Sequence, residues 1–321
     1  MIGVIYTGIK VVMGVSLIGA GYYTAKAIVT EEKEEKEEII KTENILKYEY
    51  FPIEKVNTDK KDNVIKYTFV EGDKEGIKAC VGYTTENDLS VIDVLDGHIV
   101  VGGASRWGKS NFLNVFITNI IKTYTPNEVQ LAGSDFKKSD VYYFRKYKHF
   151  ENAGVSTNKK SFLEQIEALE KEMERRANIL DKTNCRNAIS YNKKNDTKMT
   201  YIVFIVDELI QVAIDTECKN KLHNIMSKCA SYGIYFVLAS QDLTKDTIGR
   251  CKMNCSQIVG FHTFDQTDSD TLIGKGYNLQ DIIIKGRCKI KNSDGTNEVQ
   301  TFYISEEEIE ATLKPFEIAR E

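Results

Sequence analysis

One eight-residue stretch, residues 103–110, constrains this chain more than any other. It reads G-A-S-R-W-G-K-S and fits the pattern G-x-x-x-x-G-K-S. The apolar run 98–102 before it is typical of a buried strand, and the run 111–117 after it is typical of a helix. A glycine-rich loop in this position turns backbone N–H groups toward phosphate oxygens. The strand–loop–helix context therefore predicts a phosphate loop, rather than a chance glycine turn.

The loop assigns roles to single residues and predicts ATP with Mg²⁺ as its ligands. Lys109 is expected to reach the β- and γ-phosphates, and the Ser110 hydroxyl is expected to hold Mg²⁺. The amino end of the following helix adds positive potential. The predicted nucleotide-binding residues are Gly103, Ala104, Ser105, Arg106, Trp107, Gly108, Lys109, Ser110 and Asn111.

A second apolar run ends in two carboxylates. Residues 201–206 read as a strand, and Asp207 and Glu208 follow directly. Asp207 is predicted to bind magnesium through water, and Glu208 suits a general base that polarises the attacking water. Alone, an acidic pair after a strand is a common helix start. Together with the phosphate loop, the pair predicts ATP hydrolysis.

A third run, residues 234–239, is followed by Ser240 and Gln241. In a parallel sheet of the additional-strand type, this strand lies between the phosphate-loop strand and the strand that ends at Asp207. Gln241 would then face the γ-phosphate and hydrogen-bond phosphate or water. The alternative is a surface glutamine at a strand end. We expect the sensor role, and we count Gln241 with Lys109 and Glu208 as catalytic residues.

Strands that alternate with helical segments predict an α/β fold with a parallel sheet covered on both faces. The helical segment 160–181 has apolar residues at helical spacing, and residues 289–304 read as a closing hairpin. The net charge of −4 excludes a bulk basic nucleic-acid binder, so DNA contacts must come from local lysines and arginines. The seven cysteines lack paired CxxC spacing, which favours free thiols over a zinc site.

The amino-terminal residues predict a membrane anchor. Residues 2–25 carry a single charge, Lys10, and a span of about 20 apolar residues crosses a bilayer. A cleaved signal peptide is the competing interpretation, because residues 25–27 resemble an A-x-A site. A phosphate loop needs cytoplasmic ATP, so we favour an uncleaved single-pass anchor in the cell membrane with the ATPase domain in the cytoplasm. A buried or interfacial amphipathic helix stays open.

Changes in composition divide the chain into four expected segments. A charge run, EEKEEKEEIIKT, follows the anchor, and alternating β-type patterns follow the charge run. The segments are a transmembrane anchor (1–29), a charged linker (30–44), a small β-rich lead-in (45–90) and a P-loop ATPase motor domain (91–321).

The segment after residue 171 is less generic than the nucleotide motifs. Residues 172–176 read E-M-E-R-R, Arg186 and Asn187 follow, and then Tyr191 and Asn192. This is similar to the "MERR … RN … YN" helix segment of the FtsK/SpoIIIE family of ring-forming DNA translocases. Two further stretches, S-D-F-K-K at 134–138 and Y-G-I-Y at 232–235, resemble the family's "IDPK" strand end and "AAGIH" turn. The resemblance covers about residues 95–305.

Two departures from the family pattern matter. Lys252, Met253 and Asn254 begin a pattern that usually continues to an arginine before the last core strand, but no arginine follows here. Arg250 is left as a candidate for an arginine that acts on a neighbouring subunit's ATP. The few residues after Phe316 leave no room for the winged-helix module of chromosome translocases. The resemblance therefore points to the smaller members found on conjugative elements, plasmids and phages.

The resemblance implies a RecA-like P-loop NTPase and a membrane-anchored, ATP-driven DNA translocase. It implies a homo-oligomer, a hexameric ring that works in conjugation or transfer of a mobile element, with a relaxase or a secretion channel as a further candidate partner. Lys137, Lys138 and Lys252 are candidates to line the pore through which DNA passes. Two alternatives stay open: an ATPase that drives protein secretion, and a membrane-anchored ATP-binding scaffold.

Overall fold

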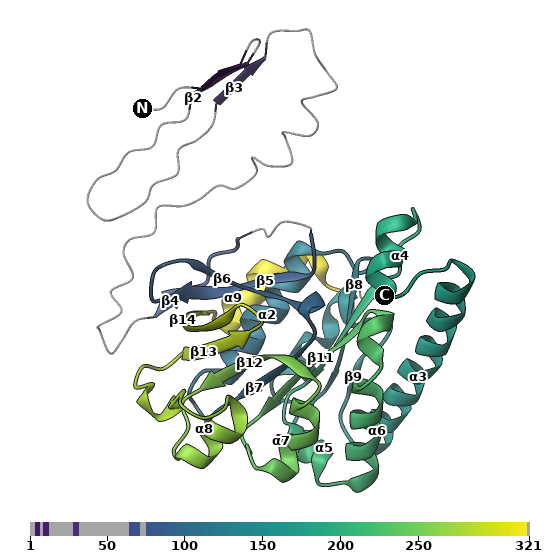
Figure 1. The fold of residues 1–321 in the computed structure, drawn as a ribbon, viewed down its shortest axis with the longest axis vertical. Helices are drawn as coiled ribbons and strands as arrows, with labels where there is room; N and C mark the ends of the chain where they lie inside the picture. Colours follow the sequence, from purple (N-terminus) through teal and green to yellow (C-terminus); the bar gives the residue numbers. More distant parts are fainter. Residues whose placement is uncertain (1–3, 7–8, 13–27, 32–63, 71–74, 320–321) are drawn as a thin grey trace. The chain divides into compact units, whose positions relative to one another are not determined.

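The computed structural model describes residues 4–6, 9–12, 28–31, 64–70 and 75–319, and divides the chain into two compact units (Figure 1). The first unit, residues 1–57, holds an antiparallel three-stranded sheet in the order β1-β2-β3. Its strands are β1 (Val4–Tyr6), β2 (Ile9–Val12) and β3 (Ile28–Glu31).

The expected anchor and linker fall mainly on residues that the structure does not describe. Residues 13–27 and 32–63 lie outside the described residues, and with them most of the apolar span and the charge run. No helix in the described part of the chain is long and apolar enough to cross a bilayer. The membrane anchor therefore stays a prediction.

The second unit, residues 58–321, is built on one sheet of eleven strands. The order is β6-β5-β14-β13-β12-β7-β11-β10-β8-β9, and β4 pairs with β14. The strands are β4 (Ile65–Lys66), β5 (Lys78–Thr84), β6 (Leu89–Asp93), β7 (His98–Gly102), β8 (Val129–Ser134), β9 (Val155–Ser156), β10 (Tyr201–Val206), β11 (Ile234–Ser240), β12 (Cys255–Phe261), β13 (Arg287–Asn292) and β14 (Gly295–Tyr303).

The strands from β12 to β9 are parallel, as the sequence predicts. β11 pairs with β7 on one side and with β10 on the other, so the additional-strand arrangement is confirmed. Parallel strands place their carboxyl ends at one edge of a sheet. The residues that follow β7, β10 and β11 therefore meet at this edge.

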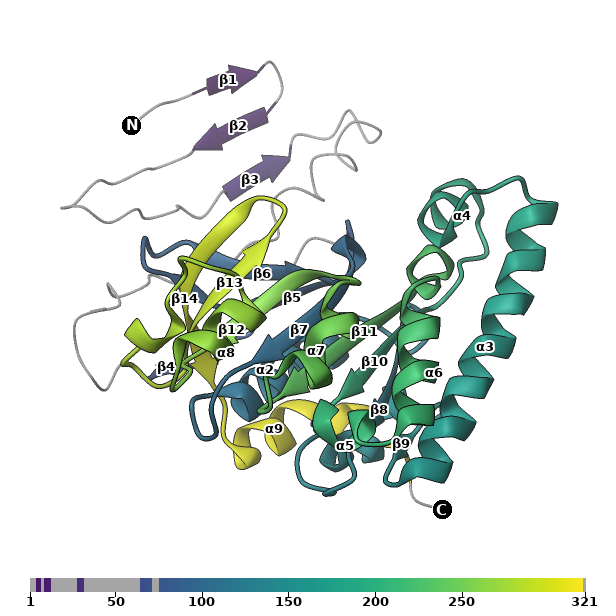
Figure 2. The same cartoon turned by 60° about the horizontal axis from the view of Figure 1, so that its bottom comes forward.

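Helices cover both faces of the sheet (Figures 1 and 2). Along β11, Tyr235 and Val237 pack on the side of α2 and α9, whereas Phe236 and Leu238 pack on the side of α3, α5, α6, α7 and α8. This two-residue alternation explains why the strand reads as a continuous apolar run. The helices are α2 (Lys109–Thr123), α3 (Lys159–Lys182), α4 (Ala188–Lys194), α5 (Leu209–Ala213), α6 (Thr216–Met226), α7 (Lys245–Lys252), α8 (Gln266–Leu272) and α9 (Glu306–Leu313).

The lead-in strands extend the ATPase sheet. β5 pairs with β14, and β6 pairs with β5, so both belong to the same compact unit as the phosphate loop. The strand expected over residues 65–70 is shorter and ends at Lys66. Its partner β14 ends at Tyr303, opposite Lys66, so the pairing cannot continue.

All seven cysteines are free thiols, and five of them are buried.

Candidate nucleotide-binding site

The phosphate loop joins β7 to α2, and two of its glycines have no substitute. Gly103 and Gly108 have φ angles of 144° and 121°, which side chains rarely adopt. A Cβ atom on Gly103 would lie 2.6 Å from the Cβ of Phe261, and one on Gly108 would lie 3.0 Å from the Cα of Gly286. Both conformation and space therefore require glycine at these positions.

Lys109 is held inside the loop. Its Nζ donates hydrogen bonds to the carbonyl oxygens of Gly103 at 2.5 Å and Ala104 at 3.1 Å. Burial lowers the pKa of Lys109 to about 8, although the nearby Glu208 and Asp207 carboxylates oppose the shift. Phosphate oxygens would replace the weaker carbonyl acceptors, because an ion pair strengthens the hydrogen bond.

Asp207 lies in a strongly negative environment at the end of β10. Burial raises its pKa to about 7, and the charges of Asp140, Asp135 and Glu208 add to the rise. A nearby cation would stabilise the charged carboxylate. No group of three or more histidine, cysteine, aspartate or glutamate residues among the described residues could hold a metal alone. Ser110 and Asp207 therefore fit Mg²⁺ only when phosphate oxygens complete the coordination.

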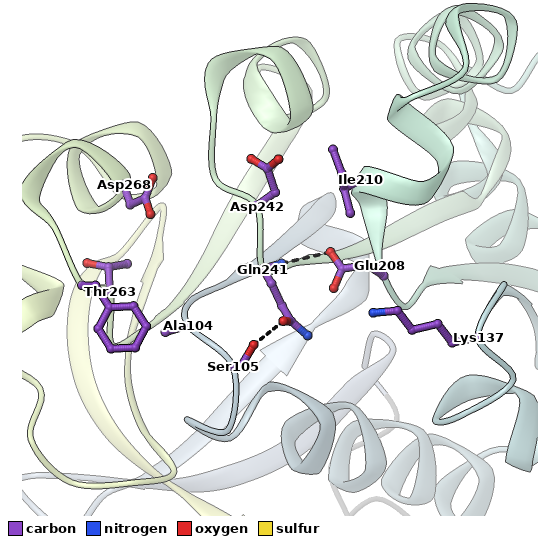
Figure 3. A pocket seen from close by; sticks show the side chains of 10 residues that line it. Ala104, Ser105, Lys137, Glu208, Ile210, Gln241, Asp242, Thr263 and Asp268 are labelled. Carbon is purple, nitrogen blue, oxygen red and sulfur yellow. Dashed lines mark hydrogen bonds between the residues drawn. The ribbon is translucent and has the colours of Figure 1, made fainter.

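The predicted base and the predicted sensor are in direct contact (Figure 3). The Glu208 carboxylate accepts the backbone N–H of Gln241 at 3.1 Å and the Ser240 hydroxyl at 3.4 Å. Ser105 of the phosphate loop donates its hydroxyl to the side-chain oxygen of Gln241. The side chains of Ser105, Glu208 and Gln241 line a cavity of about 420 Å³, together with Ala104, Lys137, Ile210, Asp242, Thr263, Phe264 and Asp268.

The loop is supported by residues that the sequence did not single out. The Trp107 ring stacks on His262 with centroids 3.9 Å apart. The His262 carbonyl accepts the N–H of Ala104 at 2.8 Å, and the Trp107 carbonyl accepts the N–H of Gly286 at 3.1 Å. No local pattern marks His262 or Gly286, because both reach the loop only through the order of strands in the sheet.

The Asn111 side chain contacts the end of β14. Its side-chain nitrogen donates to the Phe302 carbonyl at 2.5 Å, and its side-chain oxygen accepts the N–H of Ile304 at 3.0 Å. The amide group thus ties the start of α2 to the end of β14. The expected contact of Asn111 with a nucleotide stays a prediction.

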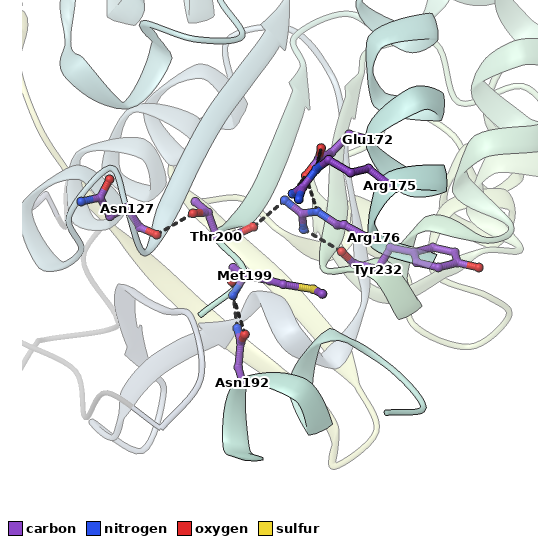
Figure 4. Close-up of polar contacts among 8 residues, drawn as sticks. All are labelled: Asn127, Glu172, Arg175, Arg176, Asn192, Met199, Thr200 and Tyr232. Carbon is purple, nitrogen blue, oxygen red and sulfur yellow. Dashed lines mark hydrogen bonds and ion pairs between the residues drawn. The ribbon is translucent and has the colours of Figure 1, made fainter. Parts of the chain in front are cut away.

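The arginine–asparagine segment is a structural clamp (Figure 4). Arg176 is only 2% exposed and donates to the carbonyls of Tyr232 and Thr200 at 2.7 and 2.8 Å, and to Glu172 at 2.7 Å. Asn192 pairs with both the N–H and the carbonyl of Met199. These contacts join α3 and α4 to the amino ends of β10 and β11. The segment therefore lies away from the carboxyl edge where the phosphate loop begins.

The other basic candidates lie in different places. Arg250 is exposed near the end of α7. Lys252 donates its ammonium group to the Thr271 carbonyl at 2.5 Å. Lys138 is exposed in a left-handed turn, and Lys137 lines the cavity next to Glu208.

Known proteins resemble this chain in sequence. The model of the FtsK/SpoIIIE family matches residues 72–245. DNA translocase FtsK of *Leptospira interrogans* serogroup Icterohaemorrhagiae serovar copenhageni is 28% identical over 255 residues, which are 75% of this chain and 27% of that protein. DNA translocase FtsK of *Staphylococcus epidermidis* is 30% identical over 228 residues, which are 66% of this chain and 28% of that protein. The chain thus spans little more than a quarter of these relatives' length.

Solved structures share the fold. ATPases 2 and 3 of EssC from *Geobacillus thermodenitrificans* superimpose with a TM-score of 0.68 at 19% identity, over 79% of this chain and 51% of that one. The pCW3 conjugation coupling protein TcpA, in monomer form with ATPγS, superimposes with a TM-score of 0.64 at 20% identity, over 78% and 74%. The predicted RecA-like P-loop ATPase fold is confirmed.

Proposed function

The chain belongs to the FtsK/SpoIIIE family, and from this membership and the nucleotide site we propose that it hydrolyses ATP to move DNA. One observation carries the hydrolytic part: Glu208, Gln241 and Ser105 converge in one cavity at the carboxyl edge of the sheet, and the Glu208 charge acts on Lys109. A carboxylate, a polar strand-end residue and a phosphate loop in one cavity form a hydrolytic constellation.

Each residue has a defined task in this proposal. Lys109 binds the β- and γ-phosphates, Glu208 takes a proton from the attacking water, and Gln241 hydrogen-bonds the γ-phosphate or that water. Ser110 and Asp207 would hold Mg²⁺, which neutralises negative charge on the phosphates when it is bound. The hydrogen bond from the Gln241 backbone keeps Glu208 in place before ATP arrives.

The cargo and the assembly are extensions of the same proposal. The curated relatives are named DNA translocases, and TcpA is named a conjugation coupling protein. We propose DNA as the cargo, a hexameric ring as the working assembly, and a single-pass anchor that holds the ATPase unit on the cytoplasmic side of the cell membrane. A relaxase or a secretion channel is the proposed partner in transfer of a mobile element.

ATP hydrolysis by the full chain in detergent, with and without DNA, tests the function. We expect hydrolysis that DNA stimulates and that Lys109→Ala abolishes, and DNA affinity that falls as salt rises. A rate of hydrolysis that does not change when DNA is added would contradict DNA as the cargo and favour a role in protein secretion. An assembled wild-type protein that binds ATP without hydrolysing it would contradict the motor and favour the scaffold.

A further inference from the structure

Lys137 is a candidate for the DNA pore in the sequence, but its side chain lines the nucleotide cavity. Figure 3 shows the Lys137 side chain extending toward Glu208, with Gln241 and Ser105 close by. Among the described residues that line this cavity, Lys137 carries the sole positive charge, beside the acids Glu208, Asp242 and Asp268. A second cation therefore faces the space next to the phosphate loop.

The backbone of Lys137 is held by a buried carboxylate. Asp135 is 1% exposed, and its oxygens accept the N–H groups of Lys137 at 3.1 Å, Asp140 at 3.0 Å and Tyr142 at 3.1 Å. The adjacent Lys138 has a left-handed φ of 59°. The two neighbouring lysines thus differ in their surroundings. Lys137 extends into the cavity, and Lys138 lies outside it, with its ammonium 5.7 Å from the Tyr142 ring centre.

The charge of Lys137 acts on the residues that would surround the γ-phosphate. Burial lowers the pKa of Lys109, and the positive charge of Lys137 contributes to that lowering. Burial raises the pKa of Asp207, and Lys137 opposes that rise. Its side chain is exposed and forms no ion pair with the described residues. The ammonium group is therefore available to an anion in the cavity.

We propose that Lys137 binds the γ-phosphate of ATP within its own subunit and enables the site to distinguish ATP from ADP. Lys109 is held within the loop, and Lys137 lines the adjoining cavity near Glu208 and Gln241. ADP lacks the phosphoryl group that would lie there. The inference rests on the proposed ATPase function and adds a catalytic residue to it.

Equilibrium binding of Mg·ATPγS and Mg·ADP to the full chain in detergent tests the proposal without requiring turnover. Lys137→Met removes the charge and keeps the length of the side chain, Lys137→Arg restores the charge, and Lys138→Met is the matched control one residue away. We expect Lys137→Met to weaken ATPγS binding by roughly 10- to 100-fold, the effect of one hydrogen bond to a charged group. ADP binding should change less than about twofold, Lys137→Arg should recover most of the ATPγS affinity, and Lys138→Met should match the wild type.

Three outcomes would overturn the proposal. Equal weakening of ADP and ATPγS would place Lys137 at the inner phosphates or in a structural role. Unchanged ATPγS affinity, with weaker binding of DNA in the absence of nucleotide, would return Lys137 to the pore. If the wild-type protein binds neither nucleotide, the ATP site itself is contradicted. That result would be a failure of the proposed function, and it differs from a failure confined to the Lys137 variants.

Discussion

The Glu208 carboxylate accepts the backbone N–H of Gln241 at 3.1 Å, so the end of β10 is tied to the end of β11. The Gln241 side chain in turn accepts the hydroxyl of Ser105. A continuous set of hydrogen bonds therefore runs from the phosphate loop through the proposed sensor to the proposed base. A change in the loop on nucleotide binding would reach Glu208 through two contacts.

Glu208→Gln should abolish turnover and preserve nucleotide binding. Glutamine cannot take a proton from water, but its side-chain oxygen can still accept the Gln241 N–H. We expect kcat to fall by roughly 10²- to 10⁴-fold, the usual contribution of a general base. Steady-state ATP hydrolysis with DNA, beside ATPγS binding to the same variant, measures both effects. Turnover near the wild-type rate would show that another group activates the water.

Ser105→Ala and Gln241→Ala should affect turnover through the same contact. Removing the Ser105 hydroxyl releases the Gln241 side chain, and we expect either variant to lower kcat by roughly fivefold or more. Residues in contact commonly show interaction energies of about 0.5–3 kcal/mol in a double-mutant cycle. The double variant should therefore be little worse than Gln241→Ala alone. Losses that simply multiply would mean that the two residues act independently.

The parallel core was predictable because its strands are buried on both faces. β10 and β11 are continuous apolar runs, and such runs are typical of strands in covered parallel sheets. The position expected for Gln241 depended on an assumed additional-strand order, and the pairing of β11 with β7 and β10 confirms that order. The sequence predicted strands in the lead-in, but the alternation of apolar and polar residues did not indicate which strands they pair with. β5 pairs with β14, which lies near the other end of this unit in the sequence. No local pattern encodes a pairing between strands so far apart in the chain.

The site was predictable in its residues and less so in their contacts. The motifs located Lys109, Glu208 and Gln241, but the bond from Ser105 to Gln241 spans 136 residues. The task of Arg176 could not be read from the segment, since its carbonyl partners lie 24 and 56 residues away in the chain. Such contacts depend on how the elements pack, which a motif does not record.

Arg176→Met should destabilise the ATPase unit far more than Arg175→Met. Both arginines pair with Glu172, but Arg176 is buried and also binds two backbone carbonyls, whereas Arg175 is exposed. Removing the buried partner leaves polar groups without hydrogen bonds, at a cost of about 3–5 kcal/mol. The exposed ion pair contributes about 0–1 kcal/mol.

Urea unfolding of both variants, followed by circular dichroism without nucleotide, measures the difference between the two arginines. We expect the midpoint of Arg175→Met to stay near that of the wild type and the midpoint of Arg176→Met to fall clearly. Equal shifts in the two variants would contradict the clamp and would leave the shared Glu172 contact as the source of stability.

His98 should make the ATPase unit less stable as the pH falls. The residue is 2% exposed at the start of β7, where one ring nitrogen lies 2.9 Å from the Met226 carbonyl and the other accepts the N–H of Phe236 at 3.1 Å. A protonated ring cannot accept that N–H. Burial lowers the pKa of His98, although the Met226 carbonyl favours the protonated form.

The sign of the effect follows from the lowered pKa. Below about pH 6.5 the unfolded chain binds a proton on His98 that the folded protein does not bind. The free energy of unfolding therefore decreases as the pH decreases, by up to about 1.4 kcal/mol per pH unit. The loss ends once the pH passes below the pKa of the folded protein. We expect His98→Gln to be less stable than the wild type at pH 8, because it alters the contacts of the ring, and to lack this titration. Because His149 and Asp207 titrate in both proteins, the difference between them isolates His98. We expect the gap in unfolding free energy to narrow by about 1 kcal/mol between pH 8 and pH 5.5. A gap that stays constant would mean that His98 titrates alike in the folded and unfolded states.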